Sequence, residues 1–199
     1  MNGASHTRRL TASFRIRGIA ALTAALLLAA PAVRAADLSA LAEHQIKALY
    51  LFNFTRYVEW PADSFSTVGD PFTIAIFASP EISEDLREIT RGKRVNGREI
   101  LVQSFDEDGI AKGCQMIFVG DMDTSRVALV LHQAESAATL TVGEADDFAT
   151  RGGIVNFVRR DNNVRLEINL DAARNARLVI SAKLLAVAGI VRGGQLVPK

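Results

Sequence analysis

The spacing of hydrophobic positions changes several times along the chain, and each change marks a predicted element. Apolar residues recur at helical intervals over 38–57, and Trp60-Pro61 ends the pattern because the residue before a proline is pushed out of the helical region. Apolar runs and helical patterns then alternate. We predict strands at 72–77, 98–105 and 115–119, and helices at 83–90, 107–112 and 121–136. This alternation is typical of a parallel sheet with crossover helices.

The last third of the chain departs from that alternation. A strand at 139–142 and an acidic turn or helix at 144–151 precede two strands, 154–160 and 164–170, which flank Asp161-Asn162-Asn163. Asparagine and aspartate tolerate positive φ, so we predict a β-hairpin. In its second strand Val164, Leu166, Ile168 and Leu170 are expected to face the core, and Arg165, Glu167 and Asn169 to face outward.

Two helices are expected to close the chain. Asp171 is expected to cap the first, and the apolar run 181–191 is expected to form the second. The predicted fold class is therefore α/β: a single domain with a mixed, mostly parallel sheet, crossover helices and a C-terminal β-hairpin followed by helices.

The first 35 residues have the pattern of an export signal. Arginines precede an uncharged apolar run at 18–30, and Val33-Arg34-Ala35 offers a cleavage site. The run is shorter than the roughly 18 residues that a membrane-spanning helix needs. We expect a signal peptide at 1–35 that is removed, and a soluble periplasmic domain at 36–199 that does not insert into the membrane.

Removal of the signal makes the chain acidic. The signal holds five of the 23 lysine and arginine residues and none of the 22 acidic ones. A net negative charge disfavours binding to nucleic acid or to anionic membranes.

Motifs of known catalytic chemistry are missing from the sequence. His44 and His132 are the histidines after the signal, and no HExxH, GxSxG or P-loop pattern occurs. We expect both histidines on helix surfaces, and we expect no enzyme activity, no cofactor and no metal. Cys114 is the single cysteine and is expected to be a buried structural thiol.

Polar clusters remain as candidates with two interpretations each. Asp121-Met122-Asp123 is either a metal pair or a helix cap, and Glu144, Asp146 and Asp147 are either an acid–base cluster or a solvated loop. The basic turn at 91–94 with Arg98 is an anion site or a solvated loop. Gly152 and Gly153 either bring the backbone close to a ligand or make a tight strand entry.

Two further groups are candidates for contact with a partner or ligand. Tyr50, Phe54 and Trp60 belong to an aromatic-rich stretch that either fills the core or is partly displayed. The row of Arg165, Glu167 and Asn169 is either a solvated sheet face or a polar contact surface.

Several motifs, in order over nearly the whole mature chain, resemble the YfiR-like family. The resemblance rests on ALYLFNF at 48–54 with VEWP at 58–61, GKRVNGR at 92–98, CQMIFV at 114–119, LTVG at 140–143, GGIVNF at 152–157, RLEIN at 165–169 and SAKLLA at 181–186.

The resemblance implies a periplasmic α/β protein that acts by binding. It implies a repressor that holds an inner-membrane diguanylate cyclase inactive through the cyclase's periplasmic sensor domain, which lowers cyclic di-GMP and biofilm formation. In members with a redox-sensitive disulfide, a cysteine in the first sheet strand pairs with the match of Cys114. Residues 72–77 of this chain contain no cysteine, so that control is not expected.

The leading hypothesis is therefore a periplasmic signalling repressor whose partner is the outer domain of a diguanylate cyclase or sensor kinase, with a homodimer left open. The alternative is a small-ligand sensor or carrier that works with a sensor kinase or transporter, with its pocket at the carboxyl ends of the parallel strands near Ala78-Ser79, Gly120 and Gly143. An exported hydrolase is a third class, which the missing nucleophile and base disfavour.

Overall fold

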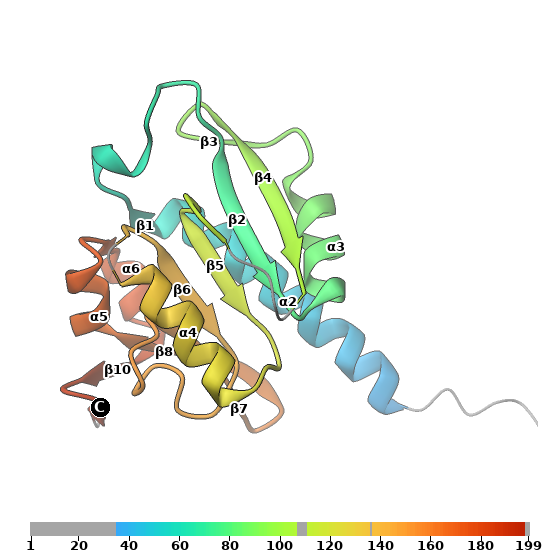
Figure 1. The fold of residues 1–199 in the computed structure, drawn as a ribbon. Coiled ribbons are helices and arrows are strands. Elements are labelled where there is room, and N and C mark those ends of the chain that lie inside the picture. Colours follow the sequence, from blue (N-terminus) through green and yellow to red (C-terminus); the bar gives the residue numbers. More distant parts are fainter. Residues whose placement is uncertain (1–34, 107–110, 136, 198–199) are drawn as a thin grey trace, which may run out of the picture. The chain divides into compact units, whose positions relative to one another are not determined.

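A nine-stranded mixed sheet organises the described part of the chain (Figure 1). The structure is a computed structural model that describes residues 35–106, 111–135 and 137–197, with side chains from Glu43 onward. Its contacts divide the chain after Leu38, and the sheet belongs to the unit that begins at Ser39. The predicted signal peptide lies almost wholly outside the described residues and stays a prediction.

The strand order is β11-β10-β8-β7-β6-β5-β2-β4-β3. Strands β4, β2, β5, β6 and β7 run parallel, β10 runs parallel to β8, and the remaining neighbours are antiparallel. This confirms the mixed, mostly parallel sheet. The strands are β2 (Phe72–Phe77), β3 (Arg94–Val95), β4 (Arg98–Phe105), β5 (Met116–Val119), β6 (Leu140–Gly143), β7 (Val155–Arg160), β8 (Asn163–Asn169), β10 (Ala188–Arg192) and β11 (Gln195–Val197).

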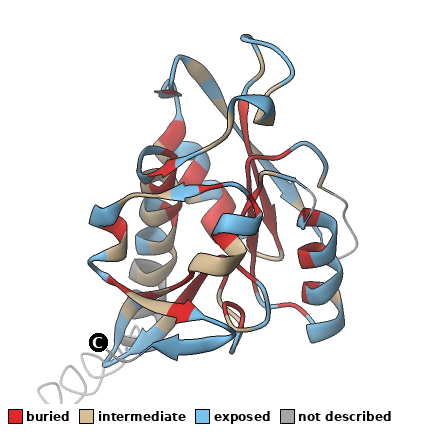
Figure 2. Cartoon of the chain, turned by 90° about the vertical axis from the view of Figure 1, so that its left-hand side faces the viewer, coloured by how far each residue is buried: buried red, intermediate tan, exposed pale blue. Residues whose placement is uncertain are grey.

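Helices cover both faces of the central strands. Helices α2 (Ala35–Tyr57) and α3 (Pro80–Thr90) pack on one face, where Leu51 and Leu86 belong to the same buried cluster as Ile74. Helix α4 (Thr124–Ala134) covers the other face, with Val127 in the cluster that holds Phe77. Buried residues concentrate on the strands between these helices (Figure 2). Side chains alternate between the two faces of a strand, so the residues of β2 contribute in turn to the cluster on each face.

Small elements surround one end of the sheet. Strand β1 (Val58–Glu59) pairs antiparallel with β9 (Val179–Ile180) in a separate two-stranded sheet. A 3-10 helix, η1 (Ala62–Ser64), follows β1, and helices α5 (Leu170–Asn175) and α6 (Ala182–Leu185) lie in the connection from β8 to β10.

The predicted hairpin is confirmed as β7 and β8. Arg160 pairs with Asn163, and the two residues between them, Asp161 and Asn162, have φ of 50° and 61°. Two positive φ values in a two-residue loop match the twist of an antiparallel pair. Leu166 and Ile168 are buried, as expected for the inward row.

The helix expected over 181–191 is wrong beyond Leu185. Helix α6 is four residues long, and the apolar run continues as β10, in which Ile190 pairs with Ile168 of β8. The run 184–191 contains no polar residue, so its sequence shows no period that separates a strand from a buried helix. Gly193 and Gly194, both at positive φ, then turn the chain into β11.

Three smaller expectations also change. The helix predicted at 107–112 lies mostly outside the described residues, and residues 111 and 112 are not helical. The cap of α5 is Asn169, whose Oδ1 accepts hydrogen bonds from the backbone N–H groups of Asp171 and Ala172, so the capping residue is not Asp171. His44 is half-buried and hydrogen-bonds Asp85 of α3, whereas His132 is exposed as expected.

The ring of Phe148 is held between two glycines. A Cβ atom added at Gly143 or Gly153 would lie 2.5 or 2.1 Å from the nearest ring atom, closer than van der Waals contact permits. Phe148 is fully buried and anchors the 144–151 segment against the sheet.

Candidate functional site

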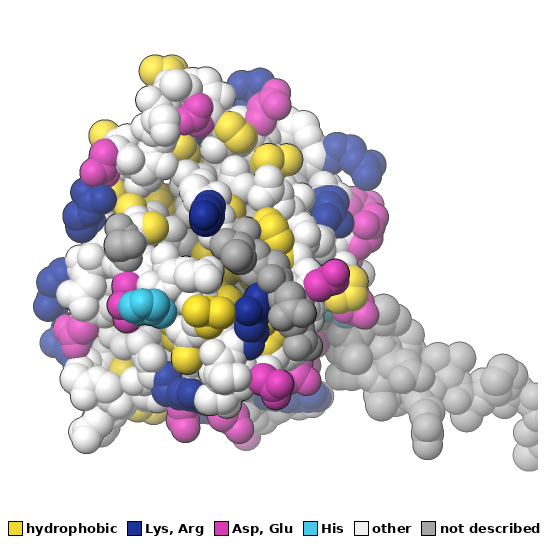
Figure 3. Space-filling model, in the orientation of Figure 1, with side chains coloured by type: hydrophobic (Ala, Val, Ile, Leu, Met, Phe, Trp, Pro, Cys, Tyr) yellow, Lys and Arg dark blue, Asp and Glu magenta, His cyan; other side chains and the backbone are white. Residues whose placement is uncertain are grey.

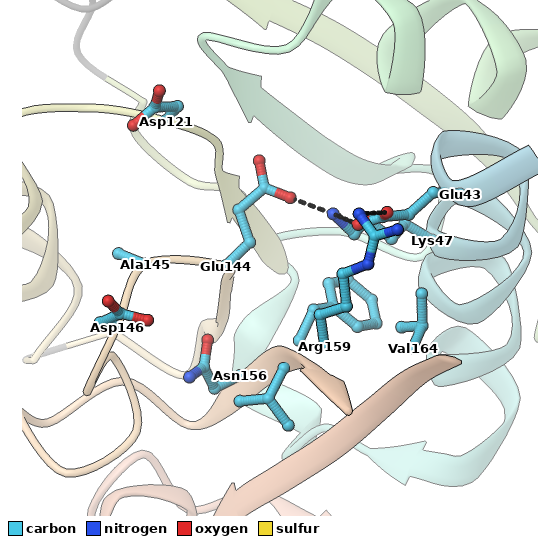
Figure 4. Close-up of a pocket in the computed structure, with 11 residues that line it drawn as sticks. Glu43, Lys47, Asp121, Glu144, Ala145, Asp146, Asn156, Arg159 and Val164 are labelled. Atoms are coloured by element: carbon cyan, nitrogen blue, oxygen red, sulfur yellow. Dashed lines mark hydrogen bonds and ion pairs between the residues drawn. The ribbon is translucent and has the colours of Figure 1, made fainter. Parts of the chain in front are cut away.

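A cavity of about 490 Å³ lies at the carboxyl ends of β5 and β6, between β7 and α2 (Figure 4). We call it the strand-end cavity. Its charged and amide side chains are Glu43, Lys47, Asp121, Glu144, Asp146, Asn156 and Arg159.

The parallel topology explains why these residues meet. The carboxyl ends of neighbouring parallel strands share one edge of the sheet, and ligand sites of open α/β sheets form there. Asp121 and Glu144 follow β5 and β6 along the chain, and Asn156 pairs with Gly143 in the β6–β7 register. Glu43 and Lys47 are one helical turn apart on α2, which closes the cavity from the other side.

Lys47 is the centre of an ion cluster in this cavity. Its Nζ lies 2.7 Å from a carboxylate oxygen of Glu43 and 2.5 Å from one of Glu144, and the side chain is 12% exposed. Burial lowers the pKa of Lys47, but hydrogen bonds to Glu144 and Glu43 outweigh burial and raise it above the usual value. The hydrogen bond from Lys47 holds the pKa of Glu43 below its usual value.

The second cation of the cavity is also engaged. Arg159 lies 3.3 Å from the other carboxylate oxygen of Glu43, and its guanidinium donates a hydrogen bond to Oδ1 of Asn162. Both cations of the cavity therefore already contact acceptors of the protein.

Three acceptors in the cavity are not engaged. Among the described residues, the side chains of Asp121 and Asp146 have neither an ion pair nor a hydrogen bond, and both residues are exposed. Asn156 is 1% exposed, and its Oδ1 is buried without a hydrogen-bond partner. With all groups ionised, four carboxylates face two cations, so the cavity is acidic.

A second hollow, the aromatic groove, lies beside β1 and the turn before β4. It has a volume of about 910 Å³ and is lined by Phe52, Thr55, Arg56, Val58, Glu59, Trp60, Lys93, Arg94, Val95 and Asn96. The Nζ of Lys93 lies 4.6 Å from the centre of the Phe52 ring. The groove thus combines aromatic rings with exposed basic side chains.

The predicted aromatic candidates occupy different environments. Phe54 is fully buried and stacks on Phe157, 6.1 Å between ring centres, and Tyr50 packs against both rings while it remains half-buried. Trp60 is half-buried, lines the aromatic groove and meets Phe72 edge to face at 4.8 Å. The core interpretation therefore fits Phe54 best, and Trp60 has one side in the core and one at the groove.

The predicted candidates among the glycines and the polar row of β8 lie apart from these aromatic residues. Gly152 and Asn169 line a cavity of about 440 Å³ near α5, whereas Gly153 packs under Phe148. Arg165 and Glu167 line a hollow of about 410 Å³ with Leu196. Asn169 is buried as a helix cap, and Glu167 pairs with Arg160. The structure does not gather the candidates into one site.

Sequence reasoning missed Lys47, Asn156 and Arg159. Lys47 interrupts an apolar helical segment, and Asn156 stands between Val155 and Phe157 in a buried strand. A polar residue at such a position needs a partner, and that requirement was the available signal. Asp121, Glu144 and Asp146 were recognised in sequence but as separate clusters.

Arg98, which follows the basic turn, and Cys114 have structural roles, whereas Lys93 and Arg94 of the turn line the aromatic groove. Arg98 donates hydrogen bonds to the backbone carbonyls of Thr67, Val68 and Asp70 and stacks over Phe65. Cys114 is 5% exposed, and burial raises its pKa to about 11, which fits the expected structural thiol.

Two negative findings apply to the described residues. No group of three or more histidine, cysteine, aspartate or glutamate side chains among them is arranged to hold a metal ion. None of their helices is long and apolar enough to cross a membrane.

The face that α4 covers shows acidic and basic side chains interspersed (Figure 3).

Comparison with known proteins matches one family model and 12 chains of solved structures, two of which are described below. The family model described as YfiR/HmsC-like matches residues 44–189. No curated protein matches the chain.

The solved structures resemble the chain only weakly. A conserved domain protein from Vibrio cholerae O1 biovar El Tor has 15% identity and a TM-score of 0.49, with 74% of this chain and 59% of that protein covered. An ABC domain in complex with L-Trp from Streptococcus pneumonia has 16% identity and a TM-score of 0.43, with 60% of this chain and 54% of that protein covered. The chain thus spans less than two thirds of either structure.

Proposed function

Because the chain belongs to the YfiR/HmsC-like family, we propose that it is a periplasmic regulator of cyclic di-GMP signalling. It binds the periplasmic sensor domain of an inner-membrane diguanylate cyclase and represses cyclic di-GMP synthesis, and so limits biofilm formation. It acts by binding and not by catalysis. The family match over most of the chain carries this proposal.

The aromatic groove supports a binding role and gives it a place. Two of the segments that resemble the family meet there: Phe52 and Trp60 come from the first, and Lys93 with its neighbours comes from the second. Aromatic and basic side chains side by side are the composition of interface hot spots. We place the cyclase contact at this groove.

The test is a deletion strain with and without the cyclase. Deletion of the gene is expected to raise cyclic di-GMP and surface attachment only when the cyclase gene is present, because a binder has no output of its own. Unchanged cyclic di-GMP in the deletion strain contradicts repression.

Complementation with charge-reversed variants tests the groove. Arg56→Glu and Lys93→Glu change exposed groove residues and are expected to abolish repression while the protein accumulates normally. Arg151→Glu is the matched control, since Arg151 is exposed and does not line the groove. Full repression by both groove variants places the interface elsewhere.

Small-ligand sensing is the second candidate function, and the strand-end cavity favours it. The cavity lies after β5 and β6, at the edge of the sheet where the sequence placed a pocket near Gly120 and Gly143. Its volume lies within the range of small-molecule sites, roughly 300–1,000 Å³.

The neighbouring genes distinguish the two functions. A neighbouring gene for a cyclase or sensor kinase supports the first function, and a neighbouring gene for a transporter supports the second.

A further inference from the structure

The unsatisfied groups of the strand-end cavity are all hydrogen-bond acceptors. The buried Oδ1 of Asn156 has no partner among the described residues, and the carboxylates of Asp121 and Asp146 have none either. A buried carbonyl oxygen without a hydrogen bond has lost its contact with water and gained nothing in return, which destabilises the folded protein. Native proteins keep such an atom where a molecule outside the chain can satisfy it.

The donors of the cavity are already committed. Lys47 is shared between Glu43 and Glu144, and Arg159 contacts Glu43 and Asn162. An anionic ligand that entered the cavity would have to displace these internal contacts and approach four carboxylates. The acceptors without partners and the excess of carboxylates therefore favour a ligand that donates hydrogen bonds and carries positive charge.

Figure 4 shows how these groups are arranged. The Lys47 cluster lies on the α2 side, Asp121 and Asp146 lie across the cavity from it, and the Asn156 amide lies below with its oxygen on the side of Glu144. A cation in the cavity would therefore lie between the carboxylates of the β5 and β6 loops and the amide oxygen of β7.

From this arrangement we infer that the strand-end cavity binds a small organic molecule with a primary ammonium group. The N–H donors of the ammonium group satisfy Asn156 Oδ1, and its charge is balanced by Asp146 and Asp121. The arrangement of the described carboxylates does not fit a metal ion, which would need three or more ligands close together. The inference deepens the second candidate function and does not depend on the cyclase.

Titration calorimetry on the purified mature protein tests the ligand class. The probes are putrescine, a linear diamine with N–H donors; tetramethylammonium, a cation without N–H donors; and acetate, an anion. Putrescine is expected to bind, and the other two are not. Absence of putrescine binding overturns the inference, and so does equal binding of tetramethylammonium or preferential binding of acetate.

Variants locate the binding in the cavity. Asp146→Asn removes an exposed, unpaired charge, and Asn156→Leu removes the buried acceptor at similar volume; each is expected to weaken putrescine binding about tenfold or more, the worth of one charge-assisted hydrogen bond. Asp147→Asn is the matched control because Asp147 is adjacent, exposed and outside the cavity lining.

Stability measurements separate a folding defect from a lost contact. Asn156→Leu is expected to leave the melting temperature of the ligand-free protein unchanged or higher, because it removes an unsatisfied polar atom. Undiminished binding by Asp146→Asn overturns the assignment even if Asn156→Leu fails to fold.

The binding assay contains no cyclase, so a failure in it leaves the cyclase proposal standing. A failure of the genetic test likewise leaves the ammonium site standing.

Discussion

The indole Nε1 of Trp60 donates a hydrogen bond of 2.9 Å to the backbone carbonyl oxygen of Gln115. This bond ties the segment after α2 to the start of β5. The side chain of Gln115 extends the link, since its amide contacts the backbone of Thr73 and Ser64. One buried glutamine, directly before β5, thus joins the residue after β1, η1 and β2.

Substitution of Trp60 tests whether the residue contributes mainly to folding stability, through its core contacts, or to partner binding, through the aromatic groove. Trp60→Ala removes the ring packed on Phe72 and the bond to Gln115, and is expected to cost about 3 kcal/mol of unfolding free energy, measured by urea denaturation. Trp60→Phe keeps a ring and is expected to cost about 1 kcal/mol for the lost hydrogen bond. A Trp60→Ala protein of normal stability that no longer represses the cyclase would make this residue an interface anchor instead.

The hairpin register is tested by two adjacent residues. Leu166→Asp puts a charge on the buried row of β8, where Leu166 is 3% exposed, and is expected to prevent soluble accumulation. Arg165→Ala changes the exposed row and is expected to leave the far-ultraviolet circular dichroism spectrum unchanged. Similar yields of the two variants contradict the observed register.

Lys47→Met tests the ion cluster through its pH dependence. The pKa of Glu43 is depressed in the folded state, so its stabilising contribution is present above pH 4.5 and lost as pH falls through the folded pKa. The pKa of Lys47 is raised, so its contribution is present below pH 10.5 and lost as pH rises through the folded pKa.

The difference in unfolding free energy between the wild type and Lys47→Met is therefore expected to be about 1.5–3 kcal/mol near neutral pH and to shrink in acid. Urea denaturation at neutral pH and at a pH below 4.5 measures it. Lys183→Met, at an exposed lysine of α6, is the control and is expected to cost nothing at either pH. A difference that grows on acidification contradicts the assigned network.

Cys114 is expected to be chemically inert in the native protein. Burial raises its pKa to about 11, so little thiolate exists at neutral pH, and only the thiolate reacts quickly. Mass spectrometry after iodoacetamide treatment is expected to show slow modification of the folded protein and rapid modification in denaturant. The melting temperature of the monomer is expected to be insensitive to reductant, and a steep fall on reduction contradicts this.

The sequence predicted the elements with strong periods or turn chemistry. The strand at 72–77, the hairpin around Asp161 and the parallel order all follow from local pattern, and the structure confirms them. The strand β10 could not be separated from a helix, because the run 184–191 contains no polar position that would mark a period.

The candidate site was harder to predict because it depends on which chain segments become neighbours. Glu43 and Glu144 are far apart in sequence, yet both contact Lys47. A parallel sheet places its carboxyl-terminal loops side by side whatever their separation in sequence. Local reasoning identified Glu144 and Asp146 as an acidic cluster and could mark Lys47 as a residue that needs a partner, but it did not show that Lys47 pairs with Glu144.

The ring of Phe148 has a consequence for how chains of this fold can diverge. Phe148 with the glycines around it, and the ion pair of Glu144 with Lys47, hold the 144–151 segment in place, whereas Asp146 makes no such contact and carries charge into the strand-end cavity. Selection can therefore alter residue 146 and change what the cavity attracts while the backbone stays the same. Any side chain at Gly143 or Gly153 displaces the ring and moves the whole segment. Among related chains we expect variation in charge at position 146 over a glycine–phenylalanine–glycine anchor that does not vary.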